Sequence, residues 1–197
     1  MLHRGLGGLL WVPMTSFWGR APVLLWTTIL GLIFSILAAT ASDFNTFYAM
    51  RALTGLFITA PQTIAIAFLR DMFFFHERAR KIGLWAVLYI SSPYIGPCLA
   101  NFVLAGTQTW RNVFWMDVGV VALQIVFILL FIDETFYNRD RPRSAQPDRP
   151  SGFGGRMLRL IGVWQIRNIS YYNTVVGSYR RFISILLKPA FLLLLIQ

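Results

Sequence analysis

Charged residues are scarce in this sequence. They make up 13% of its 197 residues, whereas 56% are hydrophobic, and a soluble domain carries about 25% charged residues. Cys98 is the only cysteine, so one chain can form neither a disulfide nor a cysteine-based metal site. The two histidines, His3 and His76, lie far apart in sequence, which argues against a metalloenzyme or a Ser-His enzyme. We therefore expect no catalytic centre, no metal and no cofactor.

Four long stretches carry at most one charge each. They cover residues 22–42, 47–69, 82–105 and 112–132. A transmembrane helix needs about 20 apolar residues, and in lipid its backbone amides must pair within the segment. The strands of an outer-membrane barrel would instead alternate polar and apolar residues. The sequence thus predicts an all-α integral membrane protein, folded as a multi-span helical bundle.

The basic residues are concentrated in alternate connections between these stretches. Arg20 precedes the first stretch and a basic cluster at 70–81 follows the second, whereas the other two connections carry few charges. The positive-inside rule places the basic connections in the cytoplasm. This distribution also explains the net charge of +10 better than nucleic-acid binding does, because a basic nucleic-acid domain needs a soluble charged face.

The ends of the chain differ from its middle. Residues 5–17 read as a partial helix, which completes an N-terminal transmembrane bundle over 1–132. Residues 133–181 are rich in Arg and Pro and predict a cytoplasmic linker. Residues 182–197 turn apolar again and read as the start of a further transmembrane helix. The lipid bilayer is the first expected partner, and the plasma membrane is favoured over vacuolar or other internal membranes.

One face of the stretch 47–69 carries small and polar side chains. Arg51, Gly55, Thr59 and Thr63 recur every four residues, so they share a helical face. An Arg within a span is costly and normally faces a protein interior or a wet cavity. The alternative is that Arg51 extends its side chain to the nearby membrane surface. We interpret this face as part of a substrate or proton pathway.

The stretch 82–105 carries a second stripe of small residues. Ser92, Gly96 and Ala100 lie four residues apart, which favours close helix packing. Pro93 and Pro97 each remove a backbone donor and favour a kink. Tight packing alone would also explain the stripe.

These segments resemble a known family of transporters. The run from Arg51 to Gly55 looks like the Arg-x-x-x-Gly signature in helix 4 of major-facilitator transporters. The run from Ser92 to Asn101 resembles their helix 5 antiporter motif, in which Gly96 and Pro97 match and Ser92 replaces a glycine. The order and spacing of the motifs are most similar to the fungal drug:proton antiporter group.

The loop before the first full stretch adds a third motif. Gly19 and Arg20 match the family's cytoplasmic loop between helices 2 and 3, whereas Ser16 and Phe17 replace its acidic residue and its first arginine. The resemblance implies a partial major-facilitator fold, the N-terminal half without helix 1, running from helix 2 to the start of helix 7. It covers nearly the whole chain.

The resemblance implies a function. The expected activity is proton-coupled transport of a small organic solute or drug, such as multidrug efflux by an antiporter, through alternating access. Arg51 would help couple proton movement, and Gly96 with Pro97 would shape the helix 5 kink. The expected partners are the small organic substrate, protons and a second half-transporter. Three alternatives stay open: an inactive truncated product, an interaction subunit of a transporter and a membrane-embedded enzyme.

Overall fold

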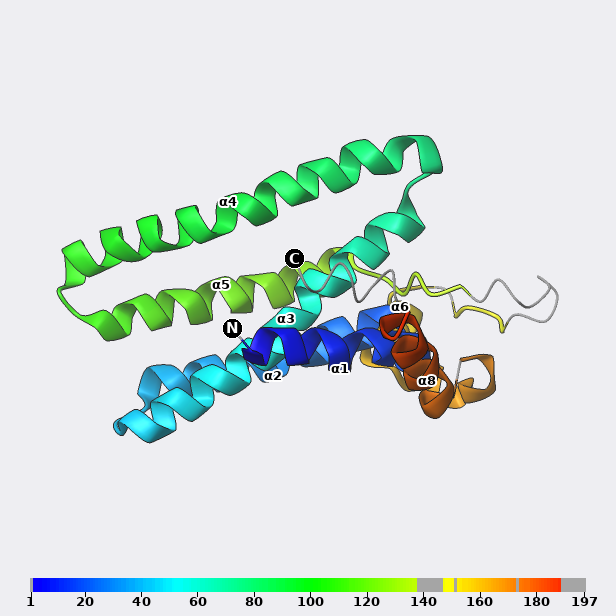
Figure 1. Cartoon of the computed structure of the whole chain (residues 1–197), viewed down its shortest axis with the longest axis horizontal. Coiled ribbons are helices and arrows are strands. Elements are labelled where there is room, and N and C mark those ends of the chain that lie inside the picture. Colours follow the sequence, from blue (N-terminus) through cyan, green and yellow to red (C-terminus); the bar gives the residue numbers. More distant parts are fainter. Residues whose placement is uncertain (1, 138–146, 151, 173, 189–197) are drawn as a thin grey trace.

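The chain folds into a helical bundle with a helical segment beside one end (Figure 1). The structure is a computed structural model, and it describes residues 2–137, 147–150, 152–172 and 174–188. Four helices are long and apolar enough to cross a membrane: α2 (Arg20–Thr40), α3 (Phe44–Met72), α4 (Phe75–Thr107) and α5 (Trp110–Phe131). Within the described residues every regular element is a helix. The predicted all-α membrane fold is confirmed.

Helices α2 and α3 form the centre of the bundle. Helix α1 (Leu2–Trp18) packs against α3, and α5 packs against α2. Small residues allow the close approach, as is common between membrane helices. A Cβ atom on Gly7 of α1 would lie 2.5 Å from the carbonyl oxygen of Leu56 on α3, and one on Gly31 of α2 would lie 3.0 Å from the Ile58 side chain.

The core combines side chains from four of these elements. Trp11 of α1, Leu24 of α2, Ile64 of α3 and Ile128 of α5 are buried together. The indole N–H of Trp11 also donates to the carbonyl oxygen of Leu56 over 3.0 Å. Such interhelical hydrogen bonds add to packing where water is absent.

Helix α4 is placed differently from the others. It runs along one side of the bundle (Figure 1), contacting α3 where it begins and α5 where it ends. None of its residues is buried. Its first turns contain the charged residues between Glu77 and Lys81, so the helix extends beyond the uncharged stretch expected over 82–105.

The segment after α5 contains helices that the sequence analysis did not name. They are α6 (Gly152–Ile161), α7 (Val163–Arg167), the short 3₁₀ helix η2 (Ile169–Tyr171) and α8 (Val175–Leu186). They lie beside the ends of α1 and α2 (Figure 1). Of the further span expected over 182–197, residues 189–197 lie outside the described part of the chain, and α8 ends at Leu186.

Candidate functional site

A pair of opposite charges joins α3 and α5. Arg51 and Asp117 each lie seven residues after the first residue of their helix, and both helices run in the same direction along the bundle (Figure 1). The Arg51 Nη1 atom is 4.0 Å from Asp117 Oδ2. The hydroxyl of Ser35 on α2 donates to the same carboxylate oxygen over 3.5 Å. Three helices thus contribute to one polar site.

The aromatic ring of Phe114 completes this site. The Arg51 guanidinium carbon lies 5.1 Å from the ring centroid, a distance at which the face of the ring attracts a cation. The side chains of Arg51 and Asp117 are 43% and 42% exposed within the chain, so the pair remains accessible. A charge at the centre of a span costs about 2.5–3.5 kcal/mol on insertion scales. A charge partner and an aromatic face offset part of that cost for Arg51.

The other members of the predicted Arg51 face lie elsewhere. Thr59 and Thr63 turn toward α1, where a Cβ on Gly7 would lie 3.2 Å from Thr59 Cβ. The Thr59 hydroxyl donates to the carbonyl oxygen of Gly55 over 2.7 Å, and no neighbour lies within 4 Å of a Cβ at Gly55. A four-residue spacing exceeds one helical turn by about 40°. The stripe therefore drifts around α3, with Arg51 facing α5 and the threonines facing α1.

The residues of the helix 5 motif lie on the open helix. Ser92, Gly96 and Pro97 are all exposed on α4. The Ser92 hydroxyl donates to the carbonyl oxygen of Tyr89 over 2.9 Å. No atom of another element lies within 4 Å of a Cβ at Gly96. Among the described residues this stripe has no packing partner, so its role stays a prediction.

The residues of the cytoplasmic loop motif lie at the first turn of α2. Gly19 has φ +92°, a backbone conformation that suits glycine, and a Cβ there would collide with the Glu134 carboxylate. That carboxylate accepts hydrogen bonds from the backbone N–H groups of Arg20 and Ala21, both over 3.2 Å. Glu134 thus caps the N-terminus of α2, where free N–H groups and the helix dipole favour an anion.

Arg20 joins this cap to α3. Its guanidinium forms an ion pair with Asp71 and donates to the carbonyl oxygen of Ala67 over 3.0 Å. Both partners lie in the last turns of α3. The loop motif therefore connects the start of α2 to the last turns of α3 and to the segment just after α5.

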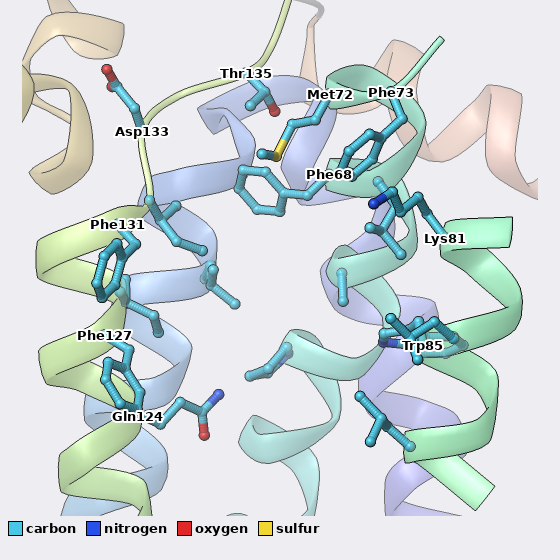
Figure 2. A pocket seen from close by; sticks show the side chains of 18 residues that line it. Phe68, Met72, Phe73, Lys81, Trp85, Gln124, Phe127, Phe131, Asp133 and Thr135 are labelled. Atoms are coloured by element: carbon cyan, nitrogen blue, oxygen red, sulfur yellow. The ribbon is translucent and has the colours of Figure 1, made fainter. Parts of the chain in front are cut away.

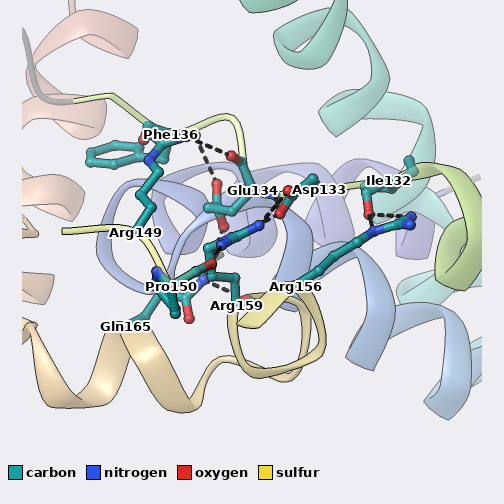
Figure 3. A network of polar contacts seen from close by, with 9 residues as sticks. All are labelled: Ile132, Asp133, Glu134, Phe136, Arg149, Pro150, Arg156, Arg159 and Gln165. Atoms are coloured by element: carbon teal, nitrogen blue, oxygen red, sulfur yellow. Dashed lines mark hydrogen bonds and ion pairs between the residues drawn. The ribbon is translucent and has the colours of Figure 1, made fainter. Parts of the chain in front are cut away.

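A network of polar contacts extends from Glu134 to the linker helices (Figure 3). Glu134 is 3% exposed and also accepts from the backbone N–H of Phe136, over 2.8 Å, and from the Gln165 amide, over 3.2 Å. Tyr172 lies close by, and its pKa is raised above the ordinary value by burial and by the negative charge of Glu134. The carboxylate is thus held by four donors in a site closed to solvent.

The neighbouring Asp133 binds α6. Arg159 donates to its two carboxylate oxygens over 3.0 and 2.6 Å. Partial burial acts to raise the pKa of Asp133. The hydrogen bonds from Arg159 and from the backbone N–H of Glu134, with the positive charges of Arg159 and Arg156, outweigh it and hold the pKa below its ordinary value. Asp133 therefore stays ionised and fixes the linker helix to the end of α5.

A cavity of about 800 Å³ opens between α3, α4 and α5 (Figure 2). Its walls are mostly aromatic and aliphatic, with Phe68 on α3, Trp85 on α4 and Phe127 on α5. Polar groups occur toward one end, where Lys81 and Asp133 lie (Figure 2), and at Gln124. Its volume falls within the range of about 300–1,000 Å³ typical of small-molecule sites.

The sequence analysis did not identify Asp117 as the partner of Arg51. Neither Asp117 nor Glu134 was related to an arginine. Equal depth along two helices of the same direction would have suggested the Arg51–Asp117 pair. No comparable pattern marks the contact of Glu134 with Gly19, which depends on the packing of α5 against α2.

These features define a multi-pass helical membrane protein with an ion pair between two of its spans and a charge network where α2, α3 and the linker helices meet. The sequence matches the model of the Major Facilitator Superfamily over residues 1–196. The chain therefore belongs to the Major Facilitator Superfamily, a family of membrane transporters. The predicted family is confirmed.

Individual relatives support this membership. The transporter paaT of Penicillium rubens is 30% identical over 132 residues, which are 67% of this chain and 24% of that protein. The efflux pump FUB11 of Gibberella fujikuroi is 30% identical over 133 residues, 66% of this chain and 22% of the pump. A bicyclomycin resistance protein homolog of Haemophilus influenzae is 26% identical over 137 residues, 68% of this chain and 34% of that protein.

The similar region is a minor part of each relative. The chain matches between 22% and 34% of the length of these three proteins. No solved structure matches the chain.

Proposed function

We propose that this chain is part of a proton-coupled transporter that moves a small organic molecule by alternating access. The observation that carries the proposal is the Arg51–Asp117 pair, which joins two spans at a distance of 4.0 Å. Ionisable residues within membrane spans commonly mark ion and proton pathways. Relatives that are named an efflux pump and a drug-resistance protein homolog favour export of a small organic substrate.

The pair suggests how a proton is coupled to movement. An ionised Asp117 attracts Arg51 and accepts a hydrogen bond from Ser35. A proton on Asp117 removes the negative charge, so Arg51 loses its partner and can bind another anion or a polar group of the substrate. In transporters of this kind the substrate lies near the membrane midplane between two repeats that move against each other. On this proposal a second half-transporter supplies the opposite wall, and the plasma membrane is the place of action.

Substitution of Arg51 in the whole transporter tests the coupling. We expect Arg51→Ala to abolish flux driven by a pH gradient without loss of expression. Arg51→Lys keeps the charge but loses the planar set of donors, so it should retain partial activity at most. Arg111→Ala is the matched control, because this exposed arginine lies at the outer start of α5 and contacts the Ala41 carbonyl. Normal proton-coupled flux by Arg51→Ala would contradict the proposal and favour an Arg51 that only reaches the membrane surface.

The chain alone provides a second test. We expect the purified 197-residue chain in proteoliposomes to show no saturable flux under a pH gradient, because a cavity between two halves needs both halves. Flux above that of empty liposomes would show that copies of this chain assemble into a working transporter. Absence of flux both here and in the whole protein would favour the inactive product or the interaction subunit.

A further inference from the structure

Helix α6 has the opposite polarity to a helix on a soluble surface. Its inward face includes Gly155, Arg159 and Leu160, which are buried, with Leu160 fully inaccessible. Its outward face carries Phe153, at 72% exposure, with Leu158 and Ile161, at 40% and 42%. A surface helix normally turns its apolar stripe to the core and its charges to water. In α6 an arginine points inward beside Leu160, and three other large apolar side chains point outward.

The arginines of α6 are held by protein groups. Arg159 binds Asp133, and Arg156 donates to the carbonyl oxygen of Ile132 from Nε and Nη2 over 3.2 and 3.0 Å (Figure 3). These contacts fix the rotation of α6 about its axis. The outward apolar face is a consequence of that rotation, and its three side chains stay between 40% and 72% exposed.

The position of α6 along α2 sets its depth. The indole N–H of Trp26 donates to the carbonyl oxygen of Ile161 over 2.9 Å, and Leu160 packs in the same core as Val23 and Leu24. Trp26 lies six residues after the start of α2, which is about 9 Å along the helix axis. Tryptophans of membrane helices concentrate at the membrane–water boundary. The end of α6 therefore lies at the level of the boundary.

The segment around α6 is strongly basic. Residues 147–188 contain six Arg and one Lys against a single acidic residue, Asp148. Arg167, Arg180 and Arg181 are exposed. Basic segments next to a membrane are attracted to the anionic lipids of the cytoplasmic leaflet.

We propose that α6 is an interfacial anchor in the cytoplasmic leaflet. The outward face formed by Phe153, Leu158 and Ile161 lies at the boundary between headgroups and acyl chains, and exposed arginines of the same basic segment bind anionic phospholipid headgroups. This is the arrangement of an amphipathic helix that lies in the plane of a membrane. The inference is independent of transport, because it concerns only the linker and the bilayer.

A fluorescent label on α6 tests the depth of the helix. In a Cys98→Ser background, Leu158→Cys is coupled to a polarity-sensitive dye, and the full chain is reconstituted in vesicles of phosphatidylcholine and phosphatidylglycerol. We expect emission at shorter wavelength and strong quenching by lipids spin-labelled near the headgroup. Thr174→Cys is the control on the same linker, because its side chain is exposed between η2 and α8, and its label should report water. Equal emission and quenching at the two positions would overturn the proposal.

The preference for anionic lipid tests the proposed contact between the arginines and phospholipid headgroups. Quenching of the Leu158 label is compared between brominated phosphatidylglycerol and brominated phosphatidylcholine, in the parent chain and in Arg167→Gln, Arg180→Gln and Arg181→Gln. We expect the preference for the anionic lipid to fall by about fivefold for an arginine that contacts headgroups. An unchanged preference in all three variants would refute the headgroup contact. A Leu158 label that is shielded from every lipid quencher would instead point to a protein partner on this face.

Discussion

Helices α2 and α4 have similar lengths of apolar sequence but opposite surroundings. Half of the most apolar window of α2 is buried inside the chain, whereas none of the corresponding window of α4 is buried. The difference lies in their neighbours. Among the described residues α2 packs against α1, α3, α5 and α6, whereas α4 has fewer contacts, made with the ends of α3 and α5. Hydropathy therefore identifies a membrane span, and only packing shows whether lipid or protein surrounds it.

Glycine substitutions should show this contrast most strongly. Gly19→Ala introduces a Cβ at a positive φ and against the Glu134 carboxylate, so we expect a loss of about 2 kcal/mol or more in the free energy of unfolding. Gly96→Ala on α4 meets no neighbour and should be neutral or slightly stabilising, because alanine favours helix by about 1 kcal/mol over glycine. Unfolding by SDS in mixed micelles, followed by circular dichroism, measures both. Equal losses would mean that α4 is packed as closely as α2.

Substitution of the carboxylate that lies at the start of α2, and of the one at the start of α4, should give the next largest difference in the free energy of unfolding. Glu134→Gln removes the anion that caps α2 and should cost about 1–2 kcal/mol, as loss of a cap does. Glu77→Gln changes a side chain in the first turn of α4 that is 48% exposed and should cost less than about 0.5 kcal/mol. The same SDS titration compares them. A Glu77 variant that is as unstable as the Glu134 variant would remove the distinction between the two helix starts.

Low pH should produce the smallest change in stability. We expect it only where α6 docks beside α2. The pKa of Asp133 is lowered by its contacts with Arg159 and the backbone, so its contribution to α6 docking is present at neutral pH. It is lost as the pH falls through the lowered pKa, below the usual Asp value of about 3.9. Because the Asp133 side chain is 44% exposed, solvent screening keeps the effect modest.

The Leu158 label reports this pH effect. We expect its emission to shift when the pH falls below about 4, and the shift should disappear in Asp133→Asn. A label at Leu88, on the exposed side of α4, should not respond. A response at Leu88 equal to that at Leu158 would indicate general unfolding instead of release of α6.

The sequence predicted the membrane spans because hydropathy determines them locally. The stretch 22–42 corresponds to α2 and the stretch 112–132 to α5. Hydropathy was less informative about α4, which begins at Phe75. A helix can continue into water beyond the point where charges end the apolar stretch. The family motifs were recognisable for a similar reason, since each lies within one short run of residues.

The contacts between distant residues could not be predicted in the same way. The pairs Arg51–Asp117 and Arg20–Asp71 each depend on the rotation of two helices, which hydropathy does not determine. Helix α6 was missed because glycines and arginines interrupt a short apolar pattern. The four-residue spacing of Phe153, Met157 and Ile161 is the signal that would have indicated it.

The contacts of α6 also determine when it can form during synthesis. Its partners Trp26, Ile132 and Asp133 all precede it in the chain, as does Glu134, which binds Gln165 of α7. A ribosome adds about 5–20 residues per second, so these partners have been synthesised seconds before α6 emerges. The hydrogen bonds described for α6 thus involve no residue after 167, so the start of α2 and the end of α5 can be joined while later residues are still being translated.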